Sequence, residues 1–168
     1  MFSNTGFVKE VQKLSKIQKA CATKNCKKEY DAVQKLSKAF KKNTDAISKK
    51  ITNYAVDLKN GKMTRDKYID HIMKEVKYGF KLIDEMIHSK EVNKYTECTL
   101  THCLTEFKNS LKILIQMLDT VCKDMHIKVG CEAKSGFEKM EKQDKISANE
   151  YLALVTKLFK EAEKMMAR

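Results

Sequence analysis

Residues 26–58 of the chain read CKKEYDAVQKLSKAFKKNTDAISKKITNYAVDL, and this stretch contains neither glycine nor proline. Mostly apolar side chains recur in it at alternating steps of four and three residues, the spacing that aligns one face of an α-helix with a partner helix. The pattern therefore predicts a helix over about residues 27–59, roughly 50 Å long at ~1.5 Å per residue. The seam positions are Cys26, Tyr30, Val33, Ser37, Phe40, Thr44, Ile47, Ile51, Tyr54 and Leu58.

Turn and cap signals divide the rest of the chain into further helices. Thr23 and Asn25 mark a break before the first long helix, and Asn60-Gly61 suits a left-handed C-terminal cap at its end. Thr64 can cap a second helix that runs to about residue 89. Heptad spacing predicts a third long helix over about residues 94–127, which should be the most buried one.

Glycine and a capping box mark the last elements. Gly130 is expected to end the third helix, and a shorter helix follows at about residues 131–142. Ser147 with Glu150 forms a capping box, S-A-N-E, that opens the last helix.

The composition excludes most other folds. The 168 residues contain no proline, no tryptophan and only five glycines, whereas a fold of many short strands needs Gly and Pro at its turns. Hydrophobic residues make up 42% of the chain, too many for a disordered tail. The predicted fold class is all-α, an antiparallel bundle of long helices.

Two pairs of similar segments indicate an internal duplication. Residues 21–30, CATKNCKKEY, match residues 98–107, CTLTHCLTEF, and both read C-x4-C-x2-E-aromatic. Residues 62–68 match residues 145–151 in the same order. We therefore predict one compact domain made of an N-terminal helix (1–20) and two tandem helical hairpins, 21–92 and 93–168. Chance similarity between lysine-rich amphipathic helices is the alternative.

The net charge of +12 is concentrated near the N-terminus. Residues 1–60 hold 14 basic and 5 acidic side chains, residues 61–128 hold 12 and 10, and residues 129–168 hold 8 and 7. Nearly all the basic residues are lysines, which lack the bidentate fit of arginine to phosphate. A solvated surface is one interpretation, and an anionic partner is the other. In the second case the candidate contacts are Lys27, Lys28, Lys35, Lys38, Lys41 and Lys42.

Six cysteines are candidate disulfide residues: Cys21, Cys26, Cys98, Cys103, Cys122 and Cys131. Two cysteines five apart on one helix lie ~7.5 Å apart along its axis and cannot bond to each other. Bridges among the first four must therefore cross between helices, and the duplication makes bridges between the two halves geometrically reasonable. The last two flank Gly130 and could staple a turn. Buried free thiols are the alternative.

Metal binding and catalysis find little support. Cys98 with His102, and Cys122 with His126, are i, i+4 pairs, but one continuous helix would separate them by ~36 Å. No phosphate-binding loop, dinucleotide fingerprint, zinc-protease or nucleophile-elbow string occurs. We therefore predict no catalytic residue, no cofactor, no metal site and no enzymatic activity.

The sequence predicts neither a signal peptide nor a membrane span. Residues 1–6 lack a basic region followed by an apolar one, and no apolar run approaches ~18 residues. We expect synthesis in the cytoplasm.

The patterns favour a structural or assembly protein that packs against other protein subunits. The alternative is non-specific nucleic-acid binding by the basic N-terminal third, through counterion release. No helix-turn-helix, RNA-recognition or OB pattern accompanies those lysines.

The segments CATKNCKKEY and CTLTHCLTEF, on a lysine-rich helical chain without proline, resemble small structural proteins of large icosahedral DNA viruses. Such viruses carry their own thiol oxidases, so the resemblance implies that a virion protein made in the cytoplasm can hold disulfides. It also implies a minor capsid protein that fastens larger subunits together. The resemblance covers about 20 residues, and it assigns no functional residue.

Overall fold

The computed structural model describes residues 20–21, 24–125 and 129–166. Within these ranges the chain forms helices and no strand, so the all-α prediction is confirmed. The N-terminal helix predicted for residues 1–20 lies outside the described residues apart from Ala20. The helices are α2 (Lys27–Lys59), α3 (Arg65–Ile87), α4 (Lys90–His102), α5 (Leu104–Met125), α6 (Val129–Glu141) and α7 (Ala148–Met166).

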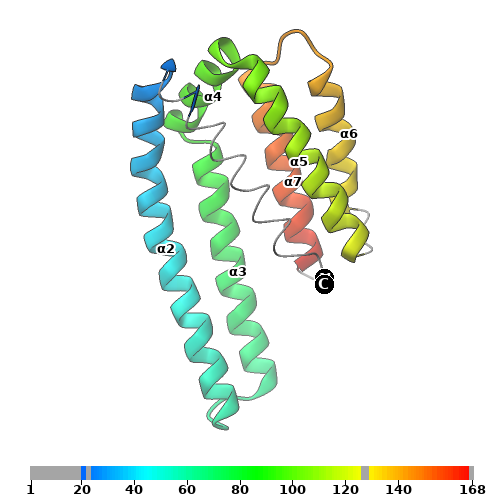
Figure 1. The fold of residues 1–168 in the computed structure, drawn as a ribbon. Helices are drawn as coiled ribbons and strands as arrows, with labels where there is room; N and C mark the ends of the chain where they lie inside the picture. Colours follow the sequence, from blue (N-terminus) through cyan, green and yellow to red (C-terminus); the bar gives the residue numbers. More distant parts are fainter. Residues whose placement is uncertain (1–19, 22–23, 126–128, 167–168) are drawn as a thin grey trace.

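One long hairpin projects from a shorter bundle (Figure 1). The helices α2 and α3 run antiparallel and extend well beyond the lower ends of α5, α6 and α7. The helix α4 lies at the upper end of α3, and α5, α6 and α7 then run down, up and down. We call residues 41–76 of the projecting hairpin the arm, and α4 to α7 the body.

Local caps define several helix ends as predicted. The Thr64 hydroxyl accepts a hydrogen bond of 3.3 Å from the Lys67 N–H and opens α3. The Ser147 hydroxyl accepts one of 3.1 Å from the Glu150 N–H and opens α7. Gly61 follows α2 with a φ of 72°, the left-handed conformation that glycine adopts without steric cost.

The prediction of one continuous helix over residues 94–127 is wrong. The helix α4 ends at His102. The next residue, Cys103, has a φ of −131° and a ψ of 39°, and α5 begins at Leu104. A disulfide holds Cys103 at this break, and α5 then runs downward as part of the body (Figure 1). Gly130 does not end a helix either, because it lies in the first turn of α6.

The main hydrophobic core lies in the body. Leu111 of α5 and Phe137 of α6 are 0% and 1% exposed, and Phe107 makes an edge contact of 4.8 Å between ring centres with Tyr151 of α7. Burying side chains of this size contributes ~1.5–3 kcal/mol each. The other buried members of the cluster are Leu100, Ala133, Met140, Ile146 and Ala148.

The hairpin of α2 and α3 is much less buried. No residue from 27 to 86 is fully buried. Two contacts set its antiparallel register: the Tyr54 ring stacks on the His71 ring with centres 4.6 Å apart, and the Lys50 Nζ atom lies 3.9 Å from Glu75 Oε1. The two helices therefore hold each other along one seam, while the rest of each surface faces outward.

Candidate functional site

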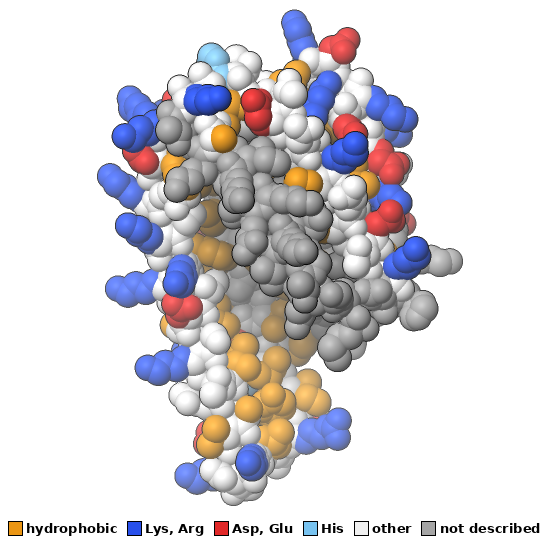
Figure 2. All heavy atoms as spheres, in the orientation of Figure 1, with side chains coloured by type: hydrophobic (Ala, Val, Ile, Leu, Met, Phe, Trp, Pro, Cys, Tyr) orange, Lys and Arg blue, Asp and Glu red, His pale blue; other side chains and the backbone are white. Residues whose placement is uncertain are grey.

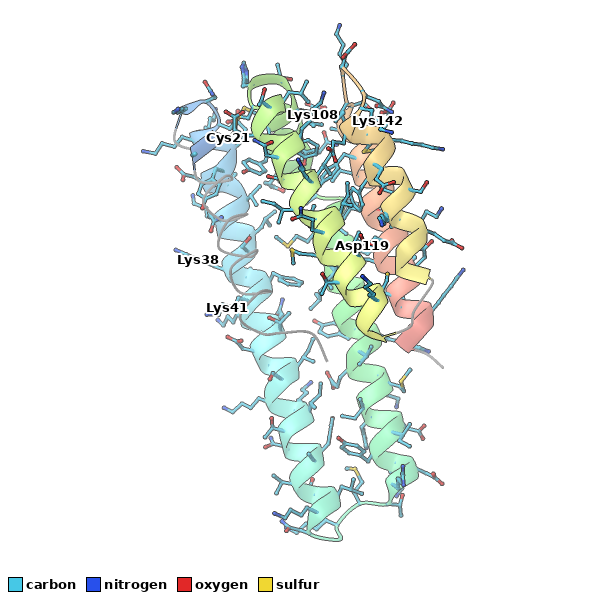
Figure 3. The ribbon with its side chains drawn as sticks, turned by 45° about the vertical axis from the view of Figure 1, so that its right-hand side comes forward. Cys21, Lys38, Lys41, Lys108, Asp119 and Lys142 are labelled. Carbon is cyan, nitrogen blue, oxygen red and sulfur yellow. A yellow bond between two sulfur atoms is a disulfide. The ribbon has the colours of Figure 1, made fainter. Side chains whose placement is uncertain are left out.

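Two disulfides join the beginning of the described chain to α4. Cys21 pairs with Cys103 and Cys26 pairs with Cys98, and in each pair the Cα atoms are 6.0 Å apart. Both bridges cross between the two predicted halves, in agreement with the geometric argument from the sequence. Figure 3 shows Cys21 at the upper end of the molecule, near the beginning of α2. We call these four cysteines the disulfide junction.

The pairing at the junction is reciprocal. The first cysteine of each C-x4-C motif bonds to the second cysteine of the other motif. The two second cysteines also share a backbone conformation: Cys26 precedes α2 with φ −126° and ψ 34°, and Cys103 follows α4 with φ −131° and ψ 39°. This similarity accords with the duplication, which itself stays a prediction.

The remaining cysteines lie at the other end of α5. Cys122 is buried and disulfide-bonded. The side chain of Cys131, its predicted partner, lies outside the described residues, so that pairing stays a prediction. Among the described residues no free cysteine occurs, which speaks against the free-thiol alternative.

An uncharged groove of about 490 Å³ lies beside the junction, between α2, α3, α4 and α7. Its volume and mainly apolar walls are typical of sites that bind apolar ligands or segments. None of its lining side chains is charged. They are Tyr30, Val33, Gln34, Ser37, Phe40, Ile83, Met86, Ile87, Val92, Tyr95, Thr96, Tyr151, Leu152, Val155 and Phe159.

Burial raises the pKa values of two tyrosines that line this groove. It raises the pKa of Tyr151 to about 12, and the nearby Tyr95 adds to that shift. The pKa of Tyr95 is also raised, chiefly by burial, although a hydrogen bond with Thr99 lowers it in part. At neutral pH both phenols are therefore neutral and can donate hydrogen bonds.

The arm carries an apolar face that continues past the end of α7. Higher up, Phe80 and Ile87 of α3 share a pocket with Phe159 of α7. The same stripe of α3 continues downward at steps of three and four residues, beside the seam of α2. Figure 2 shows hydrophobic side chains gathered on this lower part of the hairpin. We call the following six partly exposed residues the arm face: Ile47, Ile51, Leu58, Ile69, Ile72 and Val76.

A column of lysines runs along the outer side of α2. Lys28, Lys35, Lys42 and Lys49 recur every seven residues and are all exposed, which spaces them by ~10.5 Å. Figure 2 shows basic side chains along this edge, and Figure 3 shows Lys38 and Lys41 on α2 pointing away from the body. The six candidate contacts predicted from the sequence are all exposed: Lys27, Lys28, Lys35, Lys38, Lys41 and Lys42.

Two of the described histidines take part in local contacts. His71 stacks on Tyr54, and the His88 Nδ1 atom lies 2.8 Å from the carbonyl oxygen of Asp84 one turn earlier. Cys98 is bonded to Cys26, so it does not combine with the exposed His102. His126 lies outside the described residues.

Comparison with protein-family models, with curated proteins and with solved structures finds no match to this chain. In the part of the chain that the structure describes, no helix is both long enough and apolar enough to cross a membrane.

Proposed function

We propose that this protein is a structural or assembly protein whose arm binds a helix of another protein subunit. The arm face supports this proposal. Its six side chains continue a seam that α7 covers only higher up, and none of them is fully buried. Contiguous apolar surface of this kind, bordered by polar residues, is typical of protein-binding sites.

A helix is the occupant that best matches the shape of the arm face. Two antiparallel helices present a shallow groove between them, and a third helix can pack its apolar stripe there with the ridges-into-grooves geometry of a bundle. The spacing of Ile69, Ile72 and Val76 along α3 is itself the helical spacing that such packing uses.

The charge of the arm favours an acidic partner. Residues 41–76 hold nine basic and five acidic side chains. Two copies of this chain would bring like charges together, since each copy carries a net charge of +12, whereas glutamates along the edges of a partner helix would pair with the lysines. The proposed occupant is therefore an amphipathic helix with acidic edges.

A binding role rather than an enzymatic one is part of this proposal. The groove beside the disulfide junction has the volume of a ligand site, but its lining holds no charged side chain. Burial raises the pKa values of Tyr95 and Tyr151, so both of these phenols are neutral at physiological pH.

The finer proposal is a minor capsid protein located in the virion. The resemblance of the two C-x4-C segments to small structural proteins of large icosahedral DNA viruses supports it, as does the projecting arm, which suits a protein that fastens larger subunits together.

Two synthetic helical peptides test the arm as a binding site. Both carry the same leucine heptad face; one has glutamates at its edges and the other has lysines. We expect fluorescence anisotropy to show tighter binding of the glutamate peptide to the full-length oxidised chain. Ile69→Asp should weaken this binding at least about tenfold, equivalent to ~1.4 kcal/mol.

Val56→Asp is the matched control. Val56 and Ile69 are 48% and 47% exposed, but Val56 lies about 160° around α2 from its seam at ~100° per residue. The Val56→Asp variant should therefore bind the peptide as tightly as the unchanged protein. Equal losses in the two variants, or no binding of either peptide, would contradict the proposal.

Non-specific nucleic-acid binding is a second candidate, and the lysine column favours it. Four exposed cations at regular spacing along one helix can follow a row of phosphates. The variant with Lys28, Lys35, Lys42 and Lys49 all changed to Gln should then lose affinity for a mixed-sequence DNA duplex, with a shallower salt dependence. Salt-steep DNA binding that this variant abolishes, without binding of either peptide, would favour the second candidate over the first.

A further inference from the structure

The disulfide junction brings four sulfur atoms together, and three of its four cysteines are buried. The Sγ atoms of Cys21, Cys26 and Cys103 all lie within 4.8 Å of one another, and the Sγ atom of Cys98 is bonded to that of Cys26. Cys26 and Cys103 are 0% and 2% exposed. Cys98 is only half-buried, which gives a reductant and an ion a path into the cluster.

The spacing of these sulfurs fits one tetrahedral ion after reduction. Zn²⁺ binds cysteine sulfur at ~2.3 Å, so neighbouring sulfurs of a four-cysteine site are ~3.8 Å apart. Sulfurs that start ~2.05 Å apart in a disulfide must separate. Sulfurs of different bridges must approach: the Sγ atoms of Cys21 and Cys103 already lie within 4.8 Å of that of Cys26, and the Sγ atom of Cys98 starts from its bond to Cys26. Shifts of ~1 Å accomplish both for Cys21, Cys26 and Cys103, and rotation about the side-chain bonds of the half-buried Cys98 brings its Sγ atom toward the other bridge.

We propose that the reduced protein binds one Zn²⁺ ion through Cys21, Cys26, Cys98 and Cys103. Each disulfide takes two electrons and two protons from a dithiol, which closes to a cyclic disulfide, so two dithiol molecules produce four cysteine thiols. Zn²⁺ then displaces the four thiol protons, which pass to the solvent, and is held by four thiolates. The oxidised and zinc-bound forms therefore hold the same two chain segments together by different bonds.

The surroundings of the junction stabilise thiolates. Cys26 directly precedes α2, where the helix dipole favours negative charge. The Asn25 side-chain amide donates toward the Cys103 Sγ atom, with the two heavy atoms 3.9 Å apart, the kind of outer contact that orients metal ligands. Four thiolates carry more negative charge than one Zn²⁺ ion can neutralise. The exposed Lys24 and Lys27 add positive charge near the site.

The test uses the full chain carrying Cys122→Ser and Cys131→Ser, so that the junction cysteines are its only thiols. The protein is reduced with tris(2-carboxyethyl)phosphine, which consumes one phosphine and one water for each disulfide and yields the phosphine oxide and two thiols. It is then titrated with Co²⁺, whose visible absorption reports tetrahedral thiolate coordination. We expect one Co²⁺ per chain, full displacement by Zn²⁺, and no Co²⁺ absorption from the oxidised protein.

Two further measurements make the result decisive. Cys21→Ser and Cys98→Ser, each in the same background, should lower the Co²⁺ affinity at least ~tenfold. Circular dichroism should show that metal retains or restores helix in the reduced chain, since metal binding is coupled to folding. A reduced chain without tetrahedral Co²⁺ absorption, whether helical or unfolded, would overturn the proposal, and so would a serine variant that binds Co²⁺ as tightly as its parent with all four junction cysteines.

Discussion

The carboxyl groups of Glu132 in α6 and Glu161 in α7 lie close together where the two helices pack. Glu161 is 9% exposed, and among the described residues its Oε2 atom is buried without a hydrogen-bond partner. Burial raises the pKa of Glu161 and the charge of Glu132 raises it further, while Lys157 and Lys164 lower it in part. The folded protein therefore holds a proton on Glu161 more tightly than the unfolded chain does.

This raised pKa predicts a pH-dependent effect of Glu161→Gln. Stability linked to a raised carboxyl pKa is present below the unfolded-state value and is lost as pH rises through the folded-state value. At pH 8 the variant should be more stable by ~1 kcal/mol, since it removes a buried unpaired charge, and its Tm should rise by ~2–4 °C. At pH 4 the difference should vanish. Glu163→Gln on the same helix is the control, and an equal gain there, or one independent of pH, would contradict the explanation.

The two junction disulfides should stabilise the protein non-additively. The bridge of Cys21 with Cys103 spans 82 residues and encloses the bridge of Cys26 with Cys98, which spans 72. Removing either bridge by paired Ser substitutions leaves the other to close almost the same loop. Each double variant should therefore lose much less unfolding free energy than the quadruple variant. The quadruple variant should lose ~4 kcal/mol.

Urea denaturation of the three variants measures this difference, and equal, additive losses would contradict it. Peptide mapping of the non-reduced protein checks the connectivity directly. A peptide joining Cys21 to Cys98 would show a pairing other than the one in the structure.

Short-range features of this fold can be predicted from the sequence. The caps at Thr64 and Ser147 and the left-handed Gly61 each depend on residues within about one helical turn. The heptad pattern of α2 repeats over many residues, so it also identifies its helix clearly. Geometry also excludes a bond between Cys21 and Cys26 within one helix.

The break at Cys103 follows from tertiary structure. The heptad pattern runs through it from Leu100 to Phe107 without glycine or proline, so periodicity predicts a continuous helix. One signal could have located it: a break is predicted near Asn25 in the first C-x4-C motif, and a true duplication places a second break near Cys103.

The groove and the arm face could not be predicted from the sequence. The extent of the arm face depends on where α7 ends against α3, and the groove depends on four helices meeting. Neither relation is encoded by the periodicity of a single helix. The heptad pattern in the sequence of α2 is the same whether or not a third helix packs against it.

Leucine truncations should distinguish the body from the arm. Leu111 in α5 is 0% exposed, and Leu111→Ala should cost ~2–5 kcal/mol because it leaves a cavity in a packed core. Leu58→Ala makes the same chemical change near the end of α2, where the side chain is already partly exposed, and should cost ~1 kcal/mol. Urea midpoints measure both costs, and a larger loss at Leu58 would contradict this division of stability.

Alanine substitutions at two glycines of the hairpin should have opposite signs. Gly61 has a φ of 72°, a conformation that costs ~1–2 kcal/mol for other L-residues, so Gly61→Ala should destabilise. Gly79 lies inside α3, where a Cβ would meet only Ile47 Cδ1 at 3.9 Å, so Gly79→Ala should stabilise by ~0.5–1 kcal/mol. Thermal unfolding measures both, and the same sign at both positions would contradict the argument.

The nested bridges also determine how the arm responds to cutting and pulling. The whole arm lies inside both closed loops, so a protease that nicks the chain at Gly61 leaves α2 and α3 attached at their upper ends. A pulling force applied at the tip of the arm can separate α2 from α3, but the two junction disulfides limit how far the chain extends. A subunit bound to either helix of the arm would thus remain attached to the body even after α2 and α3 had separated.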